Sequence, residues 1–190
     1  MDILELLKGR RTYRRFEQKK ISKEIREEIL EAARIANCGA NRQSLRYLVI
    51  EKPEVVHKIC ELVKWAAFLP TEQGTPKENE QPVMFIAVLQ DTTVPGYSDT
   101  DAGLAIGNMT LAAWAKGVGS CIMGAIDRPK LLELFDTSEQ FALHTMVAFG
   151  YPTHKSTIVP VQDGDKKYYL DENRDYCVPK LAKEDIVTYF

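Results

Sequence analysis

Hydrophobic residues recur along the chain at two spacings, one typical of amphipathic helices and the other of strands. Helical spacing is clearest behind Ser22, a residue suited to an N-cap, where isoleucine and alanine positions follow three and four residues apart. The run at 83–90 is nearly continuous in hydrophobic residues, as in a strand covered on both faces. The expected helices are 2–7, 23–37, 53–66, 99–116, a segment behind Asp127 and one beginning near Lys183, and the expected strands are 46–51, 83–90, 120–126, 141–152 and 167–170.

These elements alternate along the chain without a boundary between them, so we expect one α+β or α/β domain over residues 1–190. The helix over 99–116 is rich in alanine and glycine and has few charges, which predicts burial at the centre of the fold or in an interface. Gly117 and Gly119 mark its end. The segment 69–82, rich in Pro, Gly and Glu, is expected to be a mobile surface loop.

Composition restricts the function classes. The chain has 190 residues, of which 45% are hydrophobic and 27% charged, as in an ordinary globular protein. A formal net charge of -2 and a pI near 6.0 argue against nucleic-acid binding. No hydrophobic run is long enough to cross a membrane, and the N-terminus lacks the pattern of an export signal. The scattered cysteines indicate reduced thiols in a cytoplasmic protein: Cys38, Cys60, Cys121 and Cys177.

A basic cluster, KGRRTYRRF, stands at residues 8–16 of this slightly acidic chain. Guanidinium groups match phosphate oxygens, and a hydroxyl adds a further donor. The cluster therefore indicates either a small-molecule phosphate site or a solvated helix end with one or two ion pairs. The candidate phosphate ligands are Arg10, Arg11, Thr12 and Arg14, whereas Lys8 and Arg15 are expected to be solvated.

Two further stretches could contact a flat heterocycle. In CGANRQS, Asn41 and Gln43 offer amides that could read a heterocycle edge, or that could cap the helix end and bind loop backbone. In GVGSCIMG, the glycines permit close backbone approach to a flat ligand, although the spacing fits neither a phosphate-binding P-loop nor a dinucleotide fingerprint.

The sequence offers no obvious catalytic acid, base, nucleophile or metal site. The three histidines have no partners at metal-ligand spacing, and no GxSxG motif is present. Cys121 is expected to be a small buried residue.

Taken together, three segments resemble the nitroreductase-like FMN oxidoreductases. RRTYRRF is similar to that family's R-R-S-x-R-x-F signature, NRQSLRYLVI to its N-x-Q-P-W-x-F-x-V segment, and AIGNMTLAAWAKGVGSCIMG to its N-x-x-L-A-A-x-x-x-G-L-G-S-C-W-I-G segment. The likeness extends from residue 1 to about residue 152.

The resemblance implies an α+β three-layer fold, with a mostly antiparallel central sheet flanked by helices, and an intimate homodimer that holds FMN at its interface. By position, Arg10, Arg11, Thr12 and Arg14 would hold the phosphate and ribityl chain, with Lys180 as a further basic contact. Cys38, Gly39 and Asn41 would approach the flavin from the partner subunit, with Gln43 on or beside the ring. The ring edge would be lined by backbone groups of Cys121, Ile122, Met123 and Gly124.

The implied activity is ping-pong hydride transfer from NADH or NADPH through flavin N5 to nitro-aromatic, quinone or enone-like acceptors, for which no catalytic side chain is required. A flavin-binding protein without turnover, a sensor or reservoir, is the alternative. Ser44-Leu45 replaces the family's Pro-Trp and Ile122-Met123 its Trp-Ile, so the pocket is expected to be less aromatic than usual.

Overall fold

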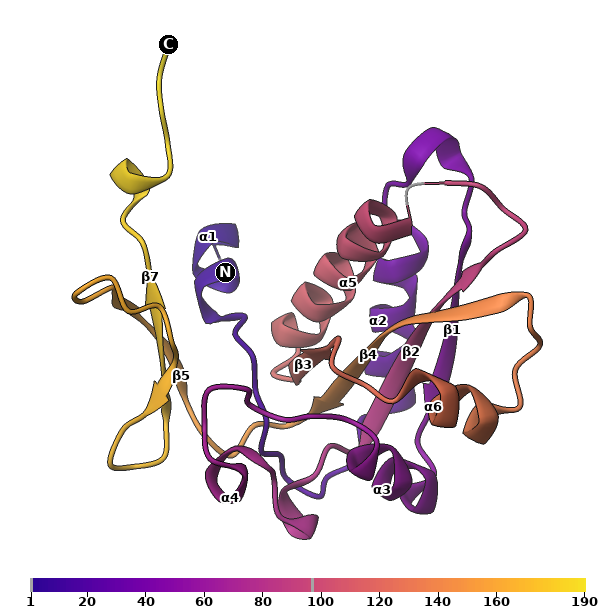
Figure 1. Ribbon diagram of the computed structural model, residues 1–190, viewed down its shortest axis with the longest axis horizontal. Coiled ribbons are helices and arrows are strands. Elements are labelled where there is room, and N and C mark those ends of the chain that lie inside the picture. The colour runs from indigo at the N-terminus through magenta and orange to yellow at the C-terminus, as the bar shows by residue number, and fades with distance from the viewer. Residues whose placement is uncertain (1, 97) are drawn as a thin grey trace.

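The computed structural model describes residues 2–96 and 98–190, which are built around a four-stranded sheet (Figure 1). Its strand order is β1-β2-β4-β3, and every neighbouring pair is antiparallel. The strands are β1 (Leu45–Ile50), β2 (Met84–Asp91), β3 (Gly119–Met123) and β4 (Phe141–Gly150). The central antiparallel sheet is therefore confirmed.

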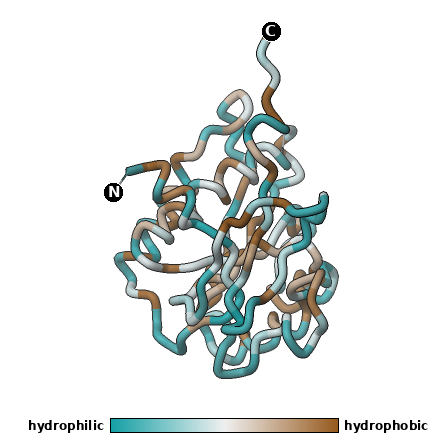
Figure 2. Tube along the Cα trace, turned by 90° about the vertical axis from the view of Figure 1, so that its left-hand side faces the viewer, coloured by the Kyte–Doolittle hydropathy of each residue, from teal (hydrophilic) through white to brown (hydrophobic). Residues whose placement is uncertain are grey.

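Helices cover both faces of this sheet and complete three layers. α2 (Lys23–Arg34) and α5 (Ser98–Ala115) cover one face, and α3 (Pro53–Glu61) and α6 (Arg128–Phe135) cover the other. Because side chains alternate along a strand, β2 sends Met84, Ile86 and Val88 into the first hydrophobic cluster and Phe85, Ala87 and Leu89 into the second. Figure 2 shows the hydrophobic segments gathered in the interior and the hydrophilic ones at the periphery.

A second, smaller sheet stands beside these layers. It has the order β5-β7-β6, with β5 (Ser156–Pro160) and β7 (Tyr176–Lys180) parallel and β6 (Tyr169–Leu170) antiparallel to β7. α1 (Ile3–Gly9) lies between β5 and α5 (Figure 1). The remaining elements are short: α4 (Thr71–Gly74), η1 (Gly39–Asn41), η2 (Glu78–Glu80) and η3 (Lys183–Asp185).

Both predicted N-caps are confirmed, but several predicted helix ends are wrong. Ser22 and Asp127 accept hydrogen bonds from the backbone N–H groups of Ile25 and Lys130. α2 ends at Arg34 rather than at residue 37, and α3 ends at Glu61 because Val63 pairs with Ile126 in an isolated bridge. The helix expected from Lys183 is a single 3-10 turn, and the segment 69–82 contains α4 and η2.

α5 is not buried all round in a single chain. One face, with Ala102, Ile106 and Met109, lies in the core. The opposite face exposes Gly103, Leu104 and Asn108, and Leu104 is 44% exposed. Complete burial of this helix within one chain is therefore excluded, and burial in an interface stays a prediction.

The basic segment after α1 packs against the start of β3. Thr12 forms a parallel bridge with Ser120, and the Tyr13 N–H donates to the Ser120 carbonyl at 2.9 Å. Gly119 permits this approach, because a Cβ there would lie 2.6 Å from Pro152 Cγ and 2.8 Å from Tyr13 Cδ2. The absence of a side chain at Gly119 therefore allows the basic segment to pack against the sheet.

Gly119→Ala is expected to destabilise the fold by about 1–3 kcal/mol, because the added methyl overpacks a rigid site. Urea unfolding of the apoprotein measures this cost. Gly124→Ala is the matched control, since a Cβ at Gly124 meets no atom within 4 Å. Equal stability of the two variants would contradict the prediction.

Candidate functional site

The basic segment, β3 and β7 converge on one cavity of about 230 Å³. Thr12 and Ser120 enter it through the bridge that joins their backbones, and Lys180 enters from the last position of β7. The lining residues are Arg10, Arg11, Thr12, Ser120, Ile122, Val178 and Lys180. Of these, Ser120 and Val178 were not among the expected site residues, although Ser120 stands in the GVGSCIMG motif.

The charge in this cavity is positive and uncompensated. No ion pair joins Arg10, Arg11 or Lys180 to a carboxylate within residues 2–96 and 98–190. The Nε atoms of both arginines are buried without a hydrogen-bond partner in that part of the chain. Burial, and then the charge of Arg10, lowers the pKa of the Arg11 guanidinium below its ordinary value. An anion with several oxygens would compensate the positive charge of this cavity.

The side chains of β3 alternate between core and cavity. Cys121 and Met123 are buried in the core, whereas Ile122 is 47% exposed and lines the cavity. Gly124 is exposed at the end of the strand. Burial raises the pKa of the Cys121 thiol, which disfavours the nucleophilic thiolate. A ligand beside β3 would therefore meet backbone groups and Ile122, not the thiol.

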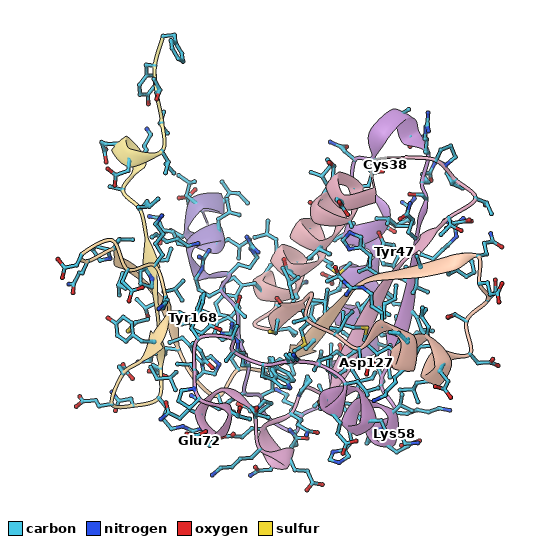
Figure 3. All side chains as sticks on the ribbon, in the orientation of Figure 1. Cys38, Tyr47, Lys58, Glu72, Asp127 and Tyr168 are labelled. Carbon is cyan, nitrogen blue, oxygen red and sulfur yellow. The ribbon has the colours of Figure 1, made fainter. Side chains whose placement is uncertain are left out.

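Arg14 and Arg15 lie outside this cavity. The Arg14 guanidinium stacks over the rings of Tyr168 and Tyr176, 4.6 and 4.8 Å from their centroids. Figure 3 labels Tyr168 at the smaller sheet. Arg15 is only 6% exposed and donates to the carbonyl oxygen of Arg174. The prediction that Arg15 is solvated was wrong, because its side chain ties the basic segment to the loop before β7.

The loop with Cys38, Gly39, Asn41 and Gln43 lies at the opposite end of α5. The Gly39 N–H donates to Asp101 Oδ1, in the first turn of that helix, at 2.8 Å. The basic segment meets the strand that follows the last turn, and an 18-residue helix is about 27 Å long. A single chain therefore does not bring the two groups of predicted site residues together.

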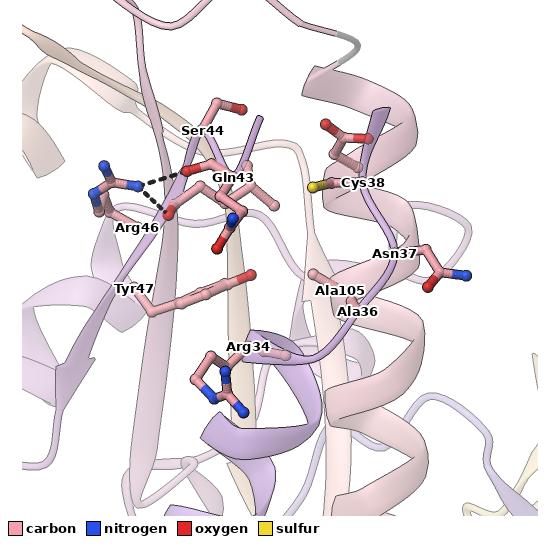
Figure 4. Close-up of a pocket in the computed structure, with 12 residues that line it drawn as sticks. Arg34, Ala36, Asn37, Cys38, Gln43, Ser44, Arg46, Tyr47 and Ala105 are labelled. Atoms are coloured by element: carbon pink, nitrogen blue, oxygen red, sulfur yellow. Dashed lines mark hydrogen bonds between the residues drawn. The ribbon is translucent and has the colours of Figure 1, made fainter. Parts of the chain in front are cut away.

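This loop borders a second cavity, of about 140 Å³ (Figure 4). Cys38 and Gln43 of this loop and Tyr47 of β1 face the cavity. Arg46 Nη1 fixes the adjoining backbone by donating to the Gln43 and Leu45 carbonyls at 2.8 Å. Ala40, Asn41 and Gln43 have φ angles of 51°, 54° and 52°. Three such residues in four positions are costly in backbone energy, which is typical of binding loops.

In the described part of the chain, no three His, Cys, Asp or Glu side chains are grouped to hold a metal ion. No helix of that part is long and hydrophobic enough to span a membrane.

The protein is therefore a three-layer α+β protein with a positively charged cavity between its sheet and its N-terminal segment. The model of the nitroreductase family matches residues 7–151, so the chain belongs to the nitroreductase family.

Relatives with related names and solved structures with the same fold are similar to this chain. A protein of Methanothermobacter thermautotrophicus named "Putative NADH dehydrogenase/NAD(P)H nitroreductase" is 24% identical over 172 residues, covering 87% of this chain and 85% of the relative. A nitroreductase family protein from Clostridium difficile 630 superimposes with a TM-score of 0.73 at 21% identity, over 100% of this chain and 98% of that chain. A Desulfovibrio desulfuricans protein solved in complex with FMN gives a TM-score of 0.70 at 24% identity, over 85% and 93% of the two chains.

Proposed function

We propose that the protein is an FMN-dependent NAD(P)H oxidoreductase. The observation that carries the proposal is the cavity where Arg10, Arg11 and Lys180 converge without carboxylate partners in the described chain. FMN ends in a phosphate, the group that such a cavity fits. The FMN complex of the Desulfovibrio protein and the NAD(P)H in the name of the archaeal relative support the same cofactors.

In this proposal Arg10, Arg11 and Lys180 bind the phosphate, with the hydroxyls of Thr12 and Ser120 as further donors. The backbone of Cys121, Met123 and Gly124 and the side chain of Ile122 adjoin the flavin ring. Arg14 is assigned to the cofactor by resemblance, and its position over the two tyrosines leaves it the least direct of these contacts.

A second copy of the chain supplies Cys38, Gly39, Asn41 and Gln43. The length of α5 keeps this loop away from the arginines of its own chain, so both groups can reach one ligand only when two chains pair. Leu104 on the outer face of α5 and Ile3 and Leu4 on α1 are exposed hydrophobic residues that a partner would cover. We therefore propose a homodimer of single domains spanning residues 1–190.

Bound FMN would supply hydride chemistry between NADH or NADPH and a nitro-aromatic, quinone or enone-like small molecule. The chain's own residues bind and orient the cofactor. Backbone N–H groups beside β3 would stabilise negative charge that develops on the ring.

The test is the visible absorption of the purified protein with FMN, before and after anaerobic NADH or NADPH. Bound flavin that bleaches with either donor supports the proposal. Bound flavin that persists with both would favour the alternative of a flavin-binding sensor or reservoir. Failure to retain FMN would contradict both functions.

A further inference from the structure

An irregularity in β4 places His144 outside the regular strand ladder. Val88 of β2 pairs with Thr145, but the next residue, Leu89, pairs with Leu143, so His144 has no partner in the register. Such a bulge turns side chains away from the regular alternation and is frequent beside functional sites. His144 is thus a titratable side chain that the proposed cofactor site does not use.

Hydrogen bonds fix both nitrogens of the His144 ring. Nε2 lies 2.9 Å from Asp99 Oδ1, and Nδ1 lies 2.7 Å from Thr145 Oγ1. Arg128 holds the bulge itself, because its Nε and Nη2 donate to the carbonyls of Leu143 and His144 at 3.1 and 3.0 Å. The Asp99 side chain is 96% exposed, so its contact with His144 orients the ring more than it stabilises the fold.

This array borders a cavity of about 450 Å³. Gly124, at the end of the strand proposed to adjoin the flavin, lines the same cavity. The charged and titratable groups that face it are Asp99 from α5, Arg128 from α6 and His144 from β4, and Gln90 of β2 adds a neutral amide. His144, a candidate proton donor, therefore lines the same cavity as the end of β3 that is proposed to adjoin the flavin.

We propose that Asp99, His144 and Thr145 form a proton relay for acceptors bound in this cavity, an inference that rests on the proposed function. A carboxylate at Nε2 leaves Nδ1 of the imidazolium free to deliver its proton to Thr145. The orienting role of the carboxylate is that of the aspartate in a Ser-His-Asp triad, with the two ring nitrogens exchanged.

Because the relay delivers a proton in addition to the hydride, the acceptor must be one whose oxygen becomes protonated. A quinone is the simplest acceptor of this class. The quinone gains two electrons and one proton as hydride, and its second proton comes from the Thr145 hydroxyl. A new O–H bond forms on the product while Thr145 recovers a proton from His144 Nδ1. His144 is left neutral with its proton on Nε2, and solvent restores the imidazolium.

The experiment measures reoxidation of the FMN-loaded, pre-reduced protein by a benzoquinone and, separately, by ferricyanide, which takes electrons without protons. His144→Gln and Thr145→Val should each slow reoxidation by benzoquinone about a hundredfold, the lower range for general acid catalysis, and leave the ferricyanide rate unchanged. Thr145→Ser should restore the benzoquinone rate. His57→Gln is the matched control, because His57 lies on α3 and bonds to Gln81.

An equal loss with both oxidants, or no loss with benzoquinone, would overturn the relay. Reducing one portion with NADH and another with dithionite separates the two proposals. If NADH does not reduce the bound flavin but dithionite does, the result counts against the proposed donor. The relay is still tested by reoxidation of the dithionite-reduced portion.

A readout independent of turnover is the tautomer of His144 in the apoprotein, measured by ¹⁵N NMR of the ring. The neutral ring should carry its proton on Nε2, toward Asp99, and Asp99→Asn should shift the population toward Nδ1–H. A neutral ring protonated on Nδ1 in the wild type would overturn the proposed direction of transfer.

Discussion

Replacing Arg10 and Arg11 together by alanine is expected to weaken FMN binding by roughly 10²–10⁴-fold. Each substitution removes a charge-assisted contact to the phosphate, a loss of about 1.5–3 kcal/mol per contact. Neither guanidinium forms an ion pair with a carboxylate in the described chain. Their other hydrogen bonds go to neutral acceptors, from Arg10 Nη1 to Thr110 Oγ1 at 3.5 Å and from Arg11 Nη2 to the Leu7 carbonyl at 2.8 Å. Fluorescence titration of FMN with the apoprotein measures the affinity.

A matched control removes two arginines elsewhere. Arg26 and Arg34 lie on α2 and pair with Glu51 and Glu31, so Arg26→Ala/Arg34→Ala changes the net charge equally without touching the cavity. Its FMN affinity should stay within a few-fold of the wild type. If both double variants lost affinity equally, a general charge effect would replace the proposed phosphate site.

Acid is expected to destabilise the protein through His154, which is 8% exposed behind the basic segment. Nε2 accepts the Arg14 N–H at 3.1 Å, and Nδ1 lies 2.9 Å from the Lys155 carbonyl, so the neutral ring satisfies both contacts. Burial is the main cause that lowers the pKa of His154 from 6.5 to about 4, and the charges of Arg15 and Arg14 act in the same direction.

The unfolded chain therefore binds this proton more readily than the folded chain does. The stabilisation is complete above pH 6.5 and is lost as the pH falls toward 4, by about 3 kcal/mol at most. Urea unfolding between pH 7 and pH 4 measures it.

His154→Gln provides the comparison, because a glutamine amide can accept from Arg14 and donate to Lys155 without titrating. The variant should lose less stability on acidification than the wild type, whereas His57→Gln should behave like the wild type. Parallel stability curves for His154→Gln and the wild type would contradict the assignment.

Local patterns were sufficient to predict the central sheet and the helices that cover it, but not β5 and β7 of the smaller sheet. The strand at β2 and the caps at Ser22 and Asp127 depend on neighbouring residues, and they are present as expected. The end of α3 was not predictable in this way, because it follows from the pairing of Val63 with Ile126 across the fold. The burial of Arg15 is also a long-range effect, since its acceptor, Arg174, is distant in the sequence.

The candidate site was predicted as separate motifs, and the tertiary structure determines which of them meet. The arginines and β3 share a cavity because Thr12 pairs with Ser120. Lys180 was expected there only by resemblance, since nothing local links β7 to the N-terminus. His144 gave no signal in the sequence, because the position of the bulge follows from the pairing of β4 with β2.

The position of the 38–43 loop at the far end of α5 from the arginines has a genetic consequence. In the proposed dimer, each of the two cofactor sites combines the arginines of one chain with the 38–43 loop of the other chain. A chain defective in its arginines and another defective in its loop would each be inactive as homodimers. Mixed together they would form heterodimers with one intact site and one doubly defective site, so two loss-of-function alleles of this gene would complement each other.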